Sequence, residues 1–217
     1  MCCMWGYAQD RRVCFRGGST GERVHSVDEL TKNARINLAL HARAQNEEAL
    51  RRGQAVVWDV GIINTVQMEN PEVVQALQNK SIVLPEMNIP RMMHARGLFD
   101  VDGNSNSWDG SWWKLRSNSV VLKLMSQNSF RQWYYSRLEP WEHYVPVRHD
   151  LKDVNSAVAY VLDDRNRESL QRMAGESPGT FVTRRCHSHR VNHRTIVQSA
   201  EEHHIQLGSR SDAPSSG

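Results

Sequence analysis

Short apolar runs alternate with helical patterns between Val13 and about Met173, and this alternation constrains the fold more than any other feature of the sequence. Strand patterns separated by helix patterns are how β-α-β units appear in a sequence. Such units place their strands parallel, with right-handed crossovers and helices on both faces. The sequence therefore predicts an α/β fold with a Rossmann-like, doubly wound parallel sheet. The expected strands are 13–15, 97–102, 119–122 and 143–146.

Capping residues mark the expected helix starts. Ser26 and Glu29 form an S-x-x-E capping box, which predicts a helical stretch through about Arg51. Asn70 and Pro71 predict a second start, with asparagine as the cap and proline at the first helical position. Further helices are expected after Ser107, over about 130–138 and after the cap residue Asp150.

Charge and composition exclude several classes of protein. The formal net charge is +3, from 27 basic and 24 acidic residues, which is too small to argue for nucleic-acid binding by itself. The apolar runs are far shorter than the ~18 residues that a membrane helix needs, so we expect no integral membrane segment. The four cysteines do not form a disulfide framework.

The chain from Arg184 onward differs in composition, with few apolar residues, five histidines and a Ser-rich end. This composition predicts a poorly ordered or loosely attached tail. Its cysteine and histidines resemble metal ligands, but they lack the second pair that finger spacing requires, so an incidental role is favoured and no metal is expected. These residues are Cys186, His187, His189 and His193.

The first candidate binding loop is 16–21, which follows the expected strand 13–15 and contains three glycines. Glycines let backbone N–H groups approach an anion, Ser19 and Thr20 add hydroxyl groups, and Arg16 offers a two-pronged cation suited to phosphate. The alternative is a surface turn with a solvated arginine. A phosphate loop of the NTPase kind is excluded, because the G-x-x-x-x-G-K-[ST] pattern is missing.

The second candidate is the polar loop 102–107, between an expected strand and an expected helix. Ligands of open α/β sheets lie beyond the carboxyl ends of strands, where the next helix offers free N–H groups. We expect this loop to open at the rim of the sheet, near the glycine loop, and to bind a ribose or a diphosphate. An ordinary capped βα loop is the alternative. Asp100 and Asp102 also form a D-x-D pair, but such tripeptides are common, and Asp102 is favoured as a ligand acceptor or cap.

Five of the seven tryptophans lie between Trp108 and Trp141. Aromatic rings can stack on sugars and bases, but tryptophans at helical spacing are more often core residues. We therefore expect Trp112 and Trp133 to lie in the core.

Several segments together resemble a known family in their order and spacing. They are Phe15-Arg16-Gly17-Gly18-Ser19-Thr20-Gly21, Asp102-Gly103-Asn104-Ser105-Asn106-Ser107-Trp108, Lys114-Leu115, Ser117-Asn118-Ser119-Val120-Val121-Leu122-Lys123, Gln132-Trp133-Tyr134-Tyr135, Leu138-Glu139-Pro140-Trp141, His143-Tyr144-Val145-Pro146-Val147 and Asp150-Leu151. The likeness extends from about Cys14 to Met173. It is to the capsule-associated-protein (CAP-type) glycosyltransferases, the family of the protein O-glucosyltransferases and O-xylosyltransferases and of lipopolysaccharide-modifying enzymes.

The resemblance implies the GT-B architecture, in which two Rossmann-like domains face a cleft and the C-terminal one holds a nucleotide-sugar donor, usually a UDP-sugar. On this basis residues 1–95 are a partial acceptor-side region, residues 96–180 the donor-binding domain and residues 181–217 the tail. The UDP-sugar is a co-substrate, and no other cofactor is implied. The partners would be this donor and a protein or polysaccharide acceptor, without nucleic acid.

The resemblance also assigns roles to residues. Arg16, Ser19 and Thr20 would contact the donor diphosphate, with Lys114 in place of an arginine that other members carry. The loop around the nucleotide or sugar would consist of Asp102, Gly103, Asn104 and Ser107, supported by Ser119 and Lys123. The catalytic base stays unknown, with Asp28 and Asp59 as guesses.

The sequence thus predicts a glycosyltransferase that moves a sugar from a UDP-sugar to a hydroxyl acceptor. The rival is a truncated, non-catalytic remnant that binds a nucleotide or a partner, which the short segment before Arg16 favours. A nucleic-acid-binding protein is a third hypothesis. The compartment stays open, since eukaryotic relatives work in the secretory pathway and bacterial ones in the cytoplasm or at the envelope.

Overall fold

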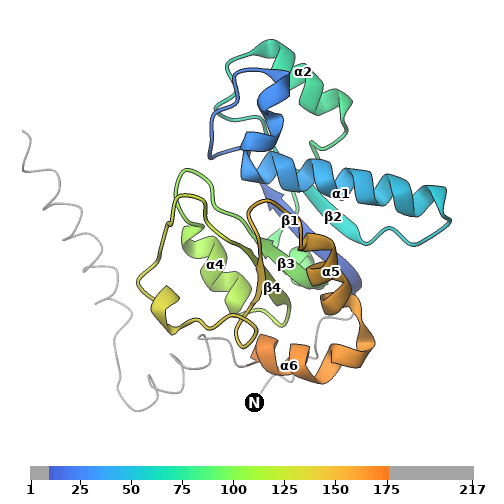
Figure 1. Ribbon diagram of the computed structural model, residues 1–217, viewed down its shortest axis with the longest axis vertical. Coiled ribbons are helices and arrows are strands. Elements are labelled where there is room, and N and C mark those ends of the chain that lie inside the picture. The colour runs from blue at the N-terminus through green and yellow to red at the C-terminus, as the bar shows by residue number, and fades with distance from the viewer. Residues whose placement is uncertain (1–9, 176–217) are drawn as a thin grey trace, which may run out of the picture. The chain divides into compact units, whose positions relative to one another are not determined.

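A computed structural model describes residues 10–175, which contain one five-stranded, all-parallel sheet (Figure 1). The strand order is β2-β1-β3-β4-β5. The predicted α/β class with a parallel sheet is confirmed, and this order is compatible with a Rossmann-like fold. The strands are β1 (Asp10–Gly17), β2 (Trp58–Ile62), β3 (Ala95–Asp100), β4 (Val120–Leu124) and β5 (Val145–Val147).

The direction of strand addition reverses between β1 and β3. The chain first adds β2 on one side of β1 and then crosses to add β3 on the other. From β3 it continues outward to β4 and β5. The chain therefore leaves β1 and β3, which are neighbours in the sheet, toward helices on opposite faces. The carboxyl edge at such a point is where open α/β sheets bind ligands.

Helices cover both faces of the sheet (Figure 1). Apolar side chains of α1, α5 and α6 pack with one face, around Phe15 and Phe99. On the other face, Met92 of α3 packs with Cys14, and Leu115 of α4 packs with Val121. The helices are α1 (Ala34–Arg51), α2 (Pro71–Asn79), α3 (Ile89–Met92), α4 (Trp108–Leu115), α5 (Val154–Leu162) and α6 (Arg167–Gly175).

The helix starts agree with the capping signals in part. Asn70 caps α2 as predicted, since its side chain accepts the N–H of Glu72. The predicted box at Ser26 is wrong, because Ser26 makes no side-chain capping bond and a short 3-10 helix, Val27–Lys32, follows it. Asn33 caps α1 instead, accepting the N–H groups of the next turn.

Two further expectations concern the chain organisation. The helix expected over 130–138 is wrong, because only a 3-10 turn, Tyr135–Arg137, forms there. The boundary expected at residue 95 falls inside the sheet, since β1 and β2 pair in one sheet with β3. The tail, with its cysteine and histidines, lies outside the described residues. Within 10–175, no helix combines the length and apolar character needed to span a bilayer.

Candidate functional site

Two loops meet at the carboxyl edge where the strand order reverses. The loop at 18–21 follows β1 and the loop at 101–107 follows β3. The backbone N–H of Gly21 donates to Asn104 Oδ1 at 3.0 Å. The expectation that the loop after Val101 lies at the rim of the sheet, beside the glycine loop, is therefore confirmed, while ligand binding there stays a prediction.

Arg35, in the first turn of α1, joins these loops. Its Nη1 donates to Gly18 O at 3.0 Å and to Thr20 Oγ1 at 2.7 Å. Its Nε donates to Asp102 O at 3.0 Å, and Nη2 donates to Val101 O at 3.2 Å. One guanidinium group thus fixes the distance between the loops after β1 and β3.

Arg35 was not among the residues predicted from the sequence, although a signal for it was present. Cations are unfavourable in the first turn of a helix, where the positive end of the dipole lies. The first turn of α1 contains no acidic residue and begins with Asn33, Ala34 and Arg35. An arginine at this position indicates a partner outside its own helix.

A cavity opens between these loops. Its wall includes Thr20 from the loop after β1, and Asp102 and Gly103 from the loop after β3. Residues 124–128 after β4 and His149 after β5 contribute polar and apolar groups. Loops after four of the strands therefore converge at one edge, as the parallel sheet requires. Of the predicted site residues, three line this cavity.

Two glycines of the site have steric reasons for lacking a side chain. Gly21 has φ +120°, which L-residues rarely adopt. A Cβ on Gly103 would lie 2.5 Å from Thr20 Oγ1 and 2.9 Å from Arg35 Nη2. The close approach of the two loops therefore depends on Gly103.

Asp102 carries an unusual carboxylate. Its Oδ2 is buried and has no hydrogen-bond partner among the described residues. Burial raises the pKa of this carboxyl above its usual value. The residue itself lines the cavity, while this oxygen is covered by the surrounding atoms.

We expect Asp102→Asn to raise the free energy of unfolding by about 1 kcal/mol at neutral pH, because it removes a poorly compensated charge. An acid whose pKa is raised by folding destabilises the fold as pH rises through that pKa. The difference between the two proteins should thus disappear below about pH 4, where the unfolded aspartate is also protonated. Urea unfolding at several pH values measures it, with Glu86→Gln, at an exposed position outside the helices and strands, as control. An Asp102→Asn protein less stable than wild type at pH 7 contradicts the prediction.

The loop after β3 leads into α4 without a side-chain cap. Ser107 occupies the N-cap position, but its side chain makes no capping hydrogen bond. Asn106 Oδ1 accepts from Gln132 Nε2 at 2.8 Å, which anchors the loop to the segment after β4. The start of α4 therefore offers its positive dipole end to the loop that carries Asn104.

A buried ionic cluster, the Asp100 cluster, lies beneath this loop. It consists of Asp100, Ser111, Lys114, Lys123 and Tyr135. Asp100 accepts from both lysine Nζ atoms at 2.9 Å and from Ser111 Oγ at 2.6 Å. Burial alone would raise the pKa of Asp100, but the two ammonium groups and the hydroxyl together lower it below its usual range. The cluster holds two cations against one carboxylate.

The predicted site residues Lys114 and Lys123 are thus committed to Asp100, and neither is among the residues of the cavity wall. Asp100 and Asp102, the D-x-D pair, lie in different environments, since Asp100 is ion-paired and Asp102 Oδ2 is unpartnered. Within residues 10–175, no group of three or more histidine, cysteine or acidic side chains is placed to hold a metal ion.

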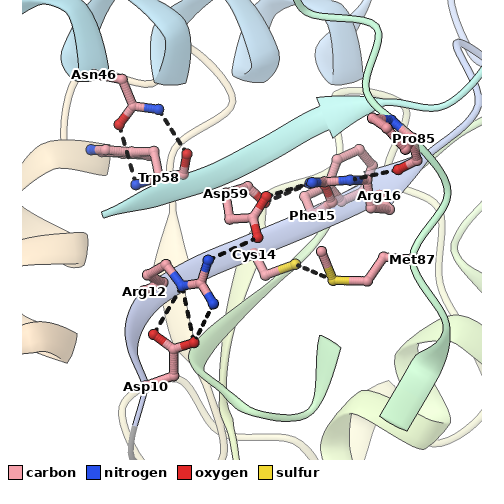
Figure 2. Close-up of polar contacts among 10 residues, drawn as sticks. All are labelled: Asp10, Arg12, Cys14, Phe15, Arg16, Asn46, Trp58, Asp59, Pro85 and Met87. Atoms are coloured by element: carbon pink, nitrogen blue, oxygen red, sulfur yellow. Dashed lines mark hydrogen bonds and ion pairs between the residues drawn. The ribbon is translucent and has the colours of Figure 1, made fainter. Parts of the chain in front are cut away.

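Arg16 lies away from the cavity, on the face of the sheet that α3 covers. Its guanidinium pairs with the Asp59 carboxylate and donates to Asp59 O at 2.8 Å and Pro85 O at 3.2 Å (Figure 2). Its side chain is only 7% exposed. Arg16 was predicted to contact the diphosphate and Asp59 was a guess for the base. In the structure the two side chains form an ion pair with each other.

Two predicted hydroxyls are also engaged within the fold. Ser19 is fully buried and its Oγ donates to Val66 O at 2.7 Å. Ser119 lies at the amino end of β4, the edge opposite the cavity, and its Oγ donates to Met93 O at 3.3 Å. Asp28 is exposed on the short 3-10 helix before α1.

The predictions for two tryptophans have opposite outcomes. Trp112 packs against a core cluster with Leu115 and Tyr134. Trp133 is 72% exposed, so its assignment to the core is wrong. The helix that would have turned it inward does not form.

A protein of Invertebrate iridescent virus 3, "Uncharacterized protein 035R", is 44% identical over 148 residues. That alignment covers 66% of this chain but only 12% of the viral protein, so the chain spans a small part of that relative. A family model for glycosyl transferase family 90 matches residues 40–195, which is more than half of the chain. The chain therefore belongs to glycosyl transferase family 90.

Proposed function

We propose that this chain binds the diphosphate of a UDP-sugar in the cavity between the loops after β1 and β3. The bound sugar is transferred to a hydroxyl group of a protein or polysaccharide acceptor. Membership of glycosyl transferase family 90 supports glycosyl transfer in general. The choice of UDP and of the acceptor follows from the likeness of the loop segments to the CAP-type enzymes.

The observation that carries the proposal is the meeting of two glycine-containing loops at the reversal of strand order. The N–H of Gly21 and the loop at 101–107 lie within hydrogen-bond distance of each other. Loops of this kind bind phosphate oxygens through backbone N–H groups. Here a bound phosphate would replace Asn104 Oδ1 as the acceptor of the Gly21 N–H. The wall also contains Thr20 and Asp102, whose hydroxyl and carboxylate suit hydroxyl groups of a ribose or a sugar.

The electrostatics suit a leaving group that gains negative charge. Transfer breaks the bond between the sugar and the diphosphate, and the diphosphate leaves with the bonding electrons. The positive end of α4, the excess cation of the Asp100 cluster and Arg35 would all favour that charge. An acceptor hydroxyl must lose its proton to a base, and none of the residues of the wall is assigned this role.

We expect Gly103→Val to weaken UDP binding by tenfold or more, about 1.4 kcal/mol, because its side chain would push apart Thr20 and Arg35. Calorimetric titration of UDP into wild type and variant measures the effect. Gly53→Asn is the control, since a Cβ there meets nothing within 4 Å and asparagine tolerates its positive φ. Absence of UDP binding to the wild type would overturn the donor site.

A second measurement separates an enzyme from a non-catalytic remnant. Many transferases slowly hydrolyse their donor when water replaces the acceptor. Release of free sugar from UDP-glucose or UDP-xylose by wild type, and its loss in Gly103→Val, supports transfer. Binding of UDP without any hydrolysis supports the remnant.

A further inference from the structure

Arg35 is a cation that, among the described residues, has no carboxylate hydrogen-bonded to its guanidinium. Among residues 10–175, its guanidinium makes four hydrogen bonds, and all four acceptors are uncharged oxygens. Its ring contact is with Phe15, 5.9 Å from the ring centroid. Burial lowers the pKa of Arg35, and the more distant Asp100 and Asp102 oppose this shift only in part.

Other arginines of the sheet are treated differently. Arg16 is paired with Asp59, and Arg96, at the amino edge, donates to Asp164 at 2.8 Å. A partly buried guanidinium without a carboxylate is electrostatically expensive, and its place in the first turn of α1 adds repulsion from the helix dipole. An anion nearby would relieve both penalties.

The position of Arg35 places its charge directly behind the cavity wall. It contacts Thr20 Oγ1 and Asp102 O, which belong to residues that line the cavity. Gly103, which also lines the cavity, lies against Nη2 of Arg35. A Cβ on Gly103 would be 2.9 Å from this atom. The charge therefore acts on a ligand across one layer of backbone.

We propose that Arg35 is a positioning residue for an anionic ligand, and that its uncompensated charge favours the diphosphate of a nucleoside diphosphate in this cavity. Its hydrogen bonds keep the loops after β1 and β3 at the spacing that the ligand bridges. The inference rests on the proposed donor site. It goes beyond that site by assigning the preference for diphosphate to a residue outside the cavity wall.

The test compares a charged ligand with a neutral one. The affinities of UDP and of uridine are measured for wild type, Arg35→Gln, Arg35→Lys and Arg96→Gln. Glutamine can still donate hydrogen bonds but carries no charge. We expect Arg35→Gln to lose at least about tenfold in UDP affinity while its uridine affinity stays within about twofold. Arg35→Lys should recover most of the loss, and Arg96→Gln should change neither affinity.

A merely structural role gives a different pattern. An equal loss for UDP and uridine in Arg35→Gln, or unchanged UDP affinity, overturns the inference while leaving the donor site intact. Wild type that binds no UDP overturns the proposed function itself. If Arg35→Gln does not fold, the Arg35 Nε–H resonance of isotope-labelled wild type replaces it. That signal, identified by its loss in Arg35→Lys, should shift with UDP and not with uridine, and an equal shift with both ligands refutes the proposal.

Discussion

Asp100→Ala should lower the free energy of unfolding by about 3–5 kcal/mol, because it leaves two buried ammonium groups without their counter-ion. The Asp100 side chain is 1% exposed, and the Lys114 and Lys123 side chains are 6% and 13% exposed. Water cannot replace the lost carboxylate without opening the region between α4 and β4. Urea unfolding followed by circular dichroism measures the change.

The control is Glu86→Ala, an exposed acidic residue outside the helices and strands, which should change stability by less than about 0.5 kcal/mol. A loss below about 1 kcal/mol for Asp100→Ala contradicts the account of the cluster. The same substitution together with Lys114→Met and Lys123→Met removes all three charges. We expect the triple variant to be more stable than Asp100→Ala, since no ion is left unpaired.

The pH dependence of this cluster has a definite sign. Folding lowers the pKa of Asp100, so the unfolded chain binds its proton more readily than the folded protein does. The stability that Asp100 contributes is therefore complete above about pH 4 and declines as pH falls below it. Folding raises the pKa of Asp102, so its contribution to stability has the opposite dependence on pH. Lowering the pH should therefore remove the stability that Asp100 contributes and also remove the penalty for the charge on Asp102.

Local signals in the sequence predicted the parts of the fold that depend on neighbouring residues. The cap at Asn70 formed because it uses a hydrogen bond within its own turn. The strand β2 was not predicted, because Asp59 and Gly61 are poor strand formers. Both have tertiary reasons: Asp59 pairs with Arg16, and a Cβ on Gly61 would lie 2.6 Å from Leu84 Cδ1.

The segment after β4 shows how tertiary context overrides a helical pattern. Tyr134 and Leu138 are spaced for one helix face and both are buried in one cluster. However, Ser129, directly before the expected helix, has φ 55° and so lacks the extended conformation typical of an N-cap residue. The Gln132 side chain bonds Asn106 in the loop after β3, which fixes the segment to the candidate site.

The position of the two loops was predicted correctly, whereas the partners of the charged side chains were not. Both loops lie at the carboxyl edge, as parallel strands require, whatever their side chains do. Arg16 and Lys114 were predicted to contact the diphosphate, and Lys123 was predicted to support the loop at 102–107. Each of them found a carboxylate inside the fold, and sequence alone does not indicate which face of a strand or helix carries a partner.

Arg16→Met should also lower the free energy of unfolding by about 3–5 kcal/mol, because it strands the Asp59 carboxylate against the sheet. The pair is enclosed by the Pro85 carbonyl and by the side of β1 that carries Cys14 (Figure 2). Arg12 Nη1 lies 3.5 Å from Asp59 Oδ2 and remains as a partial, more exposed counter-ion.

The double variant Arg16→Met/Asp59→Leu tests whether this loss comes from an unpaired charge. Replacing a buried ion pair with apolar residues is often nearly neutral, so the double variant should recover most of the stability. A double variant no more stable than Arg16→Met contradicts this.

UDP titration of the same double variant then separates an effect on binding from an effect on folding. Because Arg16 is not in the cavity wall, its UDP affinity should match wild type within about twofold. A tenfold loss of UDP affinity in a stable double variant would instead show that Arg16 contributes to the donor site.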